Sequence, residues 1–306
     1  MPVSVQHHAL SKGRELTTLL VLCAVQFTHI LDFMIMMPLG AQLMRVFAIS
    51  PAEFTRLVAA YGLAAAISGF TGGFFLDRFE RKRALLVLYA GFGLATLACG
   101  LAPTHHTLLA ARLAAGAFGG LAGSLVTAMV GDIIPPARRG RAMSYVMTAF
   151  PLASVLGVPA GLMLAGRYGW HAPFFLLAGC ATANVLLAAF ALPHLATAVK
   201  GHQPLRQMRD ILAHGVHRRA FAVGTVLVMS GGVIIPFLAP SFVANVGLDE
   251  TSQLPLAYAV GGIATAFSTP FIGWLSDRMD RLRLLVIMSA GAVVVVLFIT
   301  RLGPSS

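Results

Sequence analysis

Asp32 lies in the middle of a long apolar stretch, where an ionised carboxylate is costly to bury and is therefore a candidate for function. Gln26 and His29 precede it at steps of three residues, so on a helix the three side chains share an arc of about 120°. Such a carboxylate can take up and release a proton or pair with a cation. We predict that Asp32 carries a proton and that Gln26 and His29 line a substrate cavity. A purely structural, hydrogen-bonded acid is the alternative.

Arg112 is the one cation well inside an apolar stretch, and a guanidinium does not lose its proton in a protein. We predict that it takes part in proton coupling by tuning or replacing the charge on Asp32, or that it holds anionic groups. A structural pair that fixes the packing of two helices is the alternative. Met36 lies among further methionines that could line a tolerant apolar cavity, and we predict that it contacts substrate.

Motifs of enzymes are missing from the sequence. It has no phosphate loop with the pattern GK[ST], no zinc-like spacing of His and Cys, and no G-x-S-x-G elbow. We therefore predict that the chain is not an enzyme and has no catalytic residue, no metal and no cofactor.

The polar residues must be positioned by helices that cross a membrane. Of the 306 residues, 58% are hydrophobic and only 11% are charged, too few to cover a surface that faces water. Apolar runs of about 20 residues match the thickness of a bilayer, and at this hydrophobicity helices satisfy the backbone. The predicted fold class is all-α, a polytopic membrane helix bundle. Nine spans are expected, at about 16–38, 54–76, 84–103, 106–131, 142–166, 172–193, 220–244, 253–275 and 284–302.

The basic residues predict the orientation of these spans. The net charge is +11, but the Lys and Arg residues gather at alternate ends of the apolar runs, which is typical of a membrane protein and predicts no nucleic-acid partner. With the N-terminus in the cytoplasm, seventeen of them fall in inside segments and four in outside segments. The lipid bilayer is thus an expected partner.

An internal repeat divides the predicted spans into two halves. Residues 73–83 read GFFLDRFERKR and residues 273–283 read GWLSDRMDRLR, at an offset of 200 residues. Each copy follows an apolar span, which indicates two halves related by an axis along the membrane normal. We predict an N-terminal six-helix half (1–193), a cytoplasmic linker (194–219) and three helices of a C-terminal half (220–306). The charges of the repeat can separate two conformations by exchanging partners; membrane anchoring is the alternative.

The repeat resembles the hallmark motif of the major facilitator superfamily, roughly G-x-x-x-D-R-x-G-R-[RK], with Glu80 in the place of the second glycine. The run RLAAG around Arg112 is similar to the intramembrane arginine motif of that family. Asp132 with the following PPARRGR resembles its second cytoplasmic loop, whose acid pairs with the arginines of the first motif. The resemblance implies conformational gating by ten residues: Gly73, Asp77, Arg78, Arg81, Asp132, Arg139, Gly273, Asp277, Arg278 and Arg281.

The fifth predicted span resembles the antiporter motif of the drug:proton antiporter branch. It reads PLASVLGVPAGLMLAGRYGWHAPF, and Gly157, Pro159 and Gly161 form the part that is similar to the motif. Pro159 and the earlier Pro151 are expected to bend this span.

The resemblance implies a proton-coupled efflux transporter for drug- or sugar-like small molecules. It would work by alternating access as a monomer in the bacterial inner membrane, with its N-terminus in the cytoplasm. A facilitator or symporter of the same fold is the first alternative. Members normally have twelve spans and nine are found, so the last three are expected to be missing. A truncated, non-transporting membrane protein is therefore the second alternative.

Overall fold

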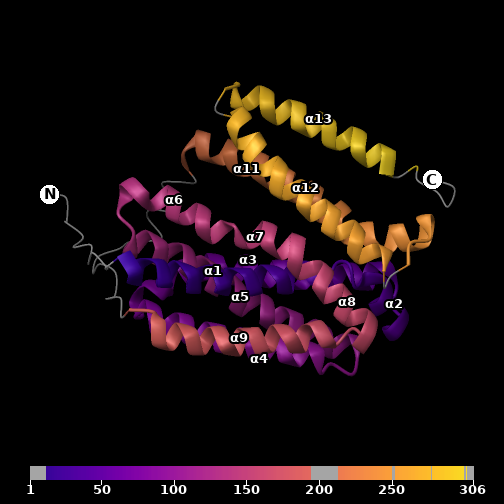
Figure 1. Cartoon of the computed structure of the whole chain (residues 1–306), viewed down its shortest axis with the longest axis horizontal. Helices are drawn as coiled ribbons and strands as arrows, with labels where there is room; N and C mark the ends of the chain where they lie inside the picture. The colour runs from indigo at the N-terminus through magenta and orange to yellow at the C-terminus, as the bar shows by residue number, and fades with distance from the viewer. Residues whose placement is uncertain (1–11, 194–212, 250–251, 277, 300, 302–306) are drawn as a thin grey trace.

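A computed structural model describes residues 12–193, 213–249, 252–276, 278–299 and 301, which are folded into helices and their connections (Figure 1). The elements in chain order are α1 (Lys12–Ile35), α2 (Gly40–Phe47), α3 (Pro51–Phe75), η1 (Leu76–Arg78), α4 (Arg81–Gly100), α5 (His105–Ile133), α6 (Pro136–Met147), α7 (Ala149–Leu152), η2 (Ala153–Gly157), α8 (Val158–Tyr168), α9 (Ala172–Ala191), α11 (Gly215–Ser241), η3 (Phe242–Val246), α12 (Gln253–Ser276) and α13 (Arg281–Ile299).

The predicted helical membrane bundle is confirmed, and helices lie at all nine predicted spans. In the described part of the chain, eight segments are long and apolar enough to cross a membrane. α12 is not one of these eight, but it is a helix of 24 residues at the eighth predicted position. The segments α6, α7, η2 and α8 together form the fifth of these spans.

Local sequence sets where the helices begin. α3 begins with a capping box in which Ser50 and Glu53 satisfy each other's backbone N–H groups, followed by Pro51 in the first turn. α5 begins with the same arrangement between Thr104 and Thr107. α1 ends at Ile35, three residues before Pro38, because the position before a proline disfavours helical backbone. The expected span 16–38 therefore stops earlier than its apolar run.

The helices α1 to α9 form one bundle. α3 and α5 pack closely because α5 carries glycines on the contact: a Cβ at Gly120 would lie within 2.6 Å of the Ala65 Cα. Two apolar clusters fill the bundle, one including Val25 and the other including Leu31 and Ile35. Both clusters contact α1, so the stretch of α1 between Val25 and Leu31 lies where they meet.

The helices α11 to α13 lie along one side of this bundle. Figure 1 shows α12 approaching α8 at one end of the molecule and diverging from α6 toward the other end. The contacts agree, because α12 packs on α7, η2 and α8, while α11 packs on α2. A Cβ at Gly262 of α12 would lie 2.7 Å from the Val155 Cα and 2.8 Å from its N, so α12 rests directly on the backbone of η2.

The division into a six-helix half, a linker and a partial second half stays a prediction. Residues 194–212 of the expected linker lie outside the described residues. α2 was not expected from the sequence. It is a helix of eight residues, too short for the periodicity of its apolar residues to stand out, and it ends at Ala48 in the left-handed conformation with φ 50°.

Candidate functional site

An ion pair between Asp32 on α1 and Arg112 on α5 lies in the interior of the bundle. Arg112 Nη1 donates to Asp32 Oδ2 at 2.8 Å, and both side chains have an exposed fraction of 0%. The same nitrogen lies 3.4 Å from the Asp32 carbonyl oxygen, and Thr96 Oγ1 on α4 donates to Asp32 Oδ1 at 3.4 Å. The two residues singled out for proton coupling are therefore in direct contact. The contact agrees equally with a structural pair, so their role in coupling stays a prediction.

Tyr61 on α3 covers the other side of Arg112. The Arg112 Cζ lies 4.3 Å from the centre of the Tyr61 ring, which is the geometry of a cation–π contact. The Tyr61 hydroxyl is hydrogen-bonded to His29 Nδ1 at 2.7 Å. His29 thus reaches the ion pair through Tyr61, and it also stacks edge-on against Phe92. The sequence did not indicate Tyr61, because an aromatic residue in an apolar run is equally suited to simple packing.

Two glycines on α5 make room for this arrangement. A Cβ at Gly119 would lie 2.6 Å from the Tyr61 hydroxyl oxygen and 2.8 Å from His29 Nδ1. One turn further, a Cβ at Gly123 would lie 3.4 Å from His29 Nε2 and 4.0 Å from Gln26 Oε1. The predicted residues Gln26 and His29 therefore both face the glycine side of α5.

Several polar atoms near the pair lack a hydrogen bond. Among the described residues, the buried atoms Arg112 Nε, Arg112 Nη2 and Gln26 Oε1 have no hydrogen-bond partner. Such atoms cost free energy unless something compensates them, and a functional role is one reason why a protein retains them. Met36 is fully buried in the apolar cluster with Leu31 and Ile35 and does not line the groove described below, so its contact with substrate stays a prediction.

The predicted gating residues lie at the end of the bundle where α4 and α6 begin. Arg81 Nε donates to Asp132 Oδ2 at 3.0 Å, which joins α4 to the end of α5. Arg139 Nη2 donates to the Gly131 carbonyl oxygen at 2.7 Å. A Cβ at Gly73 would meet nothing within 4 Å, so close packing at this glycine is not a feature of this structure.

The second copy of the repeat is described only in part. Arg78 and Arg278 are both exposed. Asp277 lies outside the described residues, and only the backbone of Asp77, Gly273 and Arg281 is described.

Glu80 and Asp280 perform the same task in the two copies of the repeat. Glu80 accepts hydrogen bonds from the backbone N–H groups of Lys82 and Arg83 at the start of α4. Asp280 accepts the corresponding bonds from Leu282 and Arg283 at the start of α13. The acid that stands in place of the family's glycine is thus an N-terminal cap, which explains why it recurs at the offset of 200 residues.

The fifth span contacts α1 through the glycines of the predicted antiporter motif. A Cβ at Gly157 would lie 2.7 Å from Leu31 Cδ1, and a Cβ at Gly161 would lie 2.5 Å from Ile35 Cδ1. The turn Ala153–Gly157 before Pro159 is a π-helix, in which the backbone widens to accommodate the proline. This π-helical turn packs against α12, and the bend itself stays a prediction.

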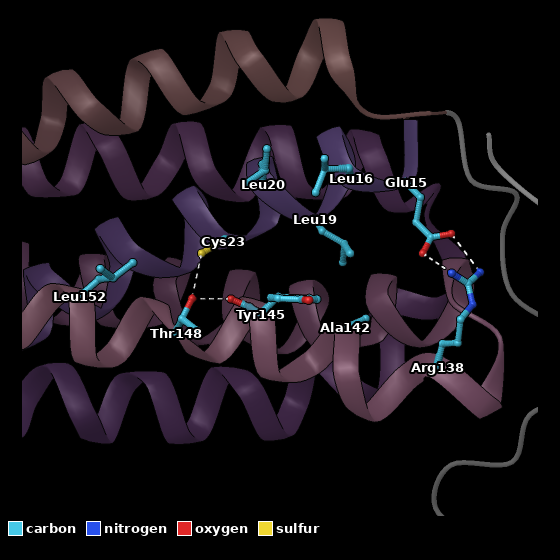
Figure 2. A pocket seen from close by; sticks show the side chains of 10 residues that line it. All are labelled: Glu15, Leu16, Leu19, Leu20, Cys23, Arg138, Ala142, Tyr145, Thr148 and Leu152. Carbon is cyan, nitrogen blue, oxygen red and sulfur yellow. Dashed lines mark hydrogen bonds and ion pairs between the residues drawn. The ribbon is translucent and has the colours of Figure 1, made fainter. Parts of the chain in front are cut away.

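A groove lies between α1 and the segments α6 and α7, with Glu15 and Arg138 at one end (Figure 2). Its volume is about 430 Å³, within the usual range of small-molecule sites. Four of its ten lining residues are leucines, and one end is closed by a bidentate ion pair in which Arg138 donates to Glu15 at 2.9 and 3.1 Å. Thr148 and Tyr145 contribute polar groups (Figure 2). The lining residues are Glu15, Leu16, Leu19, Leu20, Cys23, Arg138, Ala142, Tyr145, Thr148 and Leu152.

Comparison with known proteins gives the family of this fold. The family model described as Major Facilitator Superfamily matches residues 22–306. The chain is 27% identical over 193 residues to multidrug resistance protein 2 of Bacillus subtilis (strain 168), covering 63% of this chain and 48% of the relative. It is 24% identical over 224 residues to a probable sugar efflux transporter of Helicobacter pylori (strain HPAG1), covering 72% and 56%. The chain thus spans about half the length of these relatives.

A solved structure has the same arrangement of helices. It is a bacterial homologue of the human lysosomal transporter Spinster in an inward-facing, unoccupied conformation. The TM-score is 0.74 at 18% identity, covering 89% of this chain and 64% of that chain. At this identity the likeness concerns the fold alone.

Proposed function

Because the chain belongs to the Major Facilitator Superfamily, whose members carry small molecules across membranes, we propose that it is a proton-coupled exporter of drug- or sugar-like molecules. The observation that carries this proposal is the buried ion pair between Asp32 and Arg112. The bacterial inner membrane, with the N-terminus in the cytoplasm, is the proposed location.

The energetics of the pair favour a role in coupling. Removing two charges from water costs several kcal/mol per ion, and an apolar contact of similar size is often as stable as a buried ion pair. A pair retained at this cost is therefore a candidate for function. A proton on Asp32 neutralises its charge, whereas Arg112 stays charged, so protonation converts the pair into a single buried cation. Such a change of charge can bias the equilibrium between two conformations.

The arrangement of the helices supports alternating access. α12 contacts α7 and η2 in the middle of the fifth span, and α8, which forms the end that the Lys and Arg distribution places toward the outside. At the opposite end α12 diverges from α6 (Figure 1). We interpret this arrangement as open toward the cytoplasm. In the proposed cycle the contacts at Gly262 act as the pivot, and ion pairs such as Arg81–Asp132 are exchanged when the cytoplasmic end closes.

The groove between α1 and α6 is the proposed place where an amphipathic substrate first binds. Its leucine walls suit an apolar body, and the pair Glu15–Arg138 at its end suits a polar or charged group. The groove ends near Cys23, nine residues from Asp32, which is about 13 Å along α1. A substrate bound there lies beside the same helix that carries the proposed proton site.

Transport in everted membrane vesicles tests the proposed function. Vesicles with and without the protein are given ethidium, an amphipathic cation, or radiolabelled lactose, in the presence and absence of an inwardly acidic proton gradient. We expect at least one probe to accumulate only with the protein and the gradient, and the accumulation to collapse with a protonophore. Transport indifferent to the gradient would indicate a facilitator. Movement in the opposite direction would indicate a symporter, and no movement of either probe would contradict transport.

A further inference from the structure

We propose that Tyr61 is a positioning residue: its ring holds Arg112 in place while Asp32 carries its proton, and His29 holds the ring. This inference rests on the proposed function of Asp32. It adds a residue from α3 to a site that otherwise joins α1, α4 and α5. Tyr61 has an exposed fraction of 2%, so its contacts are those of the bundle interior.

The ring faces the guanidinium, and its hydroxyl does not. The Arg112 Cζ lies 4.3 Å from the ring centre, whereas the hydroxyl points to His29 Nδ1 at 2.7 Å. Gly119 removes the side chain that would otherwise occupy this space, because a Cβ there would overlap with the hydroxyl oxygen at 2.6 Å. Phe33 supports the ring from α1, with ring centres 5.6 Å apart. The ring is thus fixed by α1 and α5 together.

The ring becomes important when Asp32 is neutral. In the structure the guanidinium uses one nitrogen, Nη1, for Asp32, while Nε and Nη2 have no hydrogen-bond partner among the described residues. Once Asp32 is protonated, its attraction for the cation falls sharply, and a mobile arginine would leave the site or pull water in. The negative face of the tyrosine ring compensates the cation independently of the proton on Asp32. Arg112 therefore stays positioned to receive the carboxylate when the proton leaves.

The ring is the main candidate for this compensation among the groups around the site. The titratable or charged side chains around the site, besides Tyr61, are His29 and Asp32 from α1, Tyr89 and Cys99 from α4, and Arg112 itself from α5. Tyr89 donates its hydrogen bond to the Val25 carbonyl oxygen and is thereby directed to α1.

Substitutions at Tyr61 separate the ring from the hydroxyl. Tyr61→Phe keeps the ring and loses the hydrogen bond to His29, and Tyr61→Leu loses both. The readouts are gradient-driven transport in everted vesicles and counterflow, the exchange of labelled for unlabelled probe without net proton movement. Both use ethidium or lactose, whichever the wild type transports. We expect Tyr61→Leu to lower gradient-driven transport about tenfold while counterflow stays within about twofold of wild type. We expect Tyr61→Phe to retain most of both.

His29 supplies an independent check. His29→Leu removes the same hydrogen bond as Tyr61→Phe. The double variant His29→Leu/Tyr61→Phe should therefore retain as much gradient-driven transport as the less active of the two single variants. If Tyr61→Leu does not accumulate in the membrane, Tyr61→Met, which is also apolar and has no ring, replaces it. A Tyr61→Phe variant as defective as Tyr61→Leu would overturn the role of the ring. Equal losses of counterflow and gradient-driven transport in Tyr61→Leu would indicate a merely structural role.

Asp32→Asn in the same vesicles distinguishes the two proposals. If Asp32→Asn keeps gradient-driven transport, the proposed function of Asp32 fails, and the inference on Tyr61 fails with it. If Asp32→Asn loses gradient-driven transport and Tyr61→Leu keeps it, only the inference on Tyr61 fails.

Discussion

The Arg112 guanidinium donates to the Asp32 carboxylate at 2.8 Å, and neither side chain is exposed. The pair joins α1 to α5, and its two residues lie 80 positions apart in the sequence. The two apolar clusters of the bundle meet on α1 near this pair. Because the surroundings are apolar, each of the two charges depends on the other for its compensation. This mutual dependence leads to a first prediction about stability.

Removing one partner of the pair should cost more than removing both. Arg112→Gln leaves Asp32 with only its contact to Thr96, and we expect a loss of about 3–5 kcal/mol of folding free energy. Asp32→Asn/Arg112→Gln leaves no uncompensated charge and should recover a large part of that loss. Thermal unfolding of the purified protein in detergent measures both. Equal melting temperatures for the single and double variants would contradict this prediction.

The glycines of α5 should differ in their tolerance of a methyl group. Gly119→Ala places a Cβ 2.6 Å from the Tyr61 hydroxyl oxygen, so the ring or His29 must move, and overpacking of this kind costs about 1–3 kcal/mol. Gly123→Ala, one turn away, meets His29 at an ordinary contact distance of 3.4 Å and serves as the matched control. We expect a lower melting temperature for Gly119→Ala alone. The same decrease in both variants would show that Tyr61 and His29 do not limit the space.

The contact of α12 with the fifth span should depend on one of two adjacent glycines. Gly262→Ala brings a Cβ to 2.7 Å from the Val155 Cα, and because the obstacle is backbone, the helices must separate. Gly261→Ala meets nothing within 4 Å and is the control. We expect a destabilisation of about 1–3 kcal/mol for Gly262→Ala and little change for Gly261→Ala. If Gly262→Ala has the same melting temperature as the wild type, α12 does not rest on η2 in the folded protein.

The two N-terminal caps of the repeat should contribute similarly. Glu80→Ala and Asp280→Ala each remove an acceptor for two backbone N–H groups, so each should lower stability by about 1 kcal/mol. Glu80→Asp keeps a carboxylate at the cap and is the control. Chemical or thermal unfolding monitored by circular dichroism gives the comparison. A Glu80→Ala variant as stable as wild type would leave the recurrence of the acid without a structural reason.

The membrane fold could be predicted from the sequence because each span is a continuous apolar run of neighbouring residues. Apolar runs place most helix ends within a few residues of the structure, although α1 ends at Ile35 and the expected first span ran on to Pro38. The contact between Asp32 and Arg112 was also anticipated, because buried opposite charges need each other. The repeat pointed to the family, although the capping role of Glu80 became clear only from its hydrogen bonds.

The parts that could not be predicted depend on contacts between distant segments. Tyr61 looks like any aromatic residue of an apolar run until the glycines of α5 bring it next to Arg112 and His29. Glu15 and Arg138 are 123 residues apart, and nothing near either one signals that they close the same groove. The role of Met36 stays a prediction, because a methionine suited to a cavity is equally suited to the packed core in which it lies here.

Gradient-driven transport by Asp32 variants tests the central proposal most directly. The experiment measures gradient-driven accumulation of the transported probe in everted vesicles for the wild type, Asp32→Asn and Asp32→Glu. Asp32→Asn cannot carry a proton but keeps a hydrogen-bonding side chain of the same size, and Asp32→Glu keeps the carboxylate. We expect accumulation to be abolished in Asp32→Asn and retained in part in Asp32→Glu, with comparable amounts of protein in the membrane. Accumulation by Asp32→Asn at the rate of the wild type would contradict the assignment of Asp32 as the proton carrier.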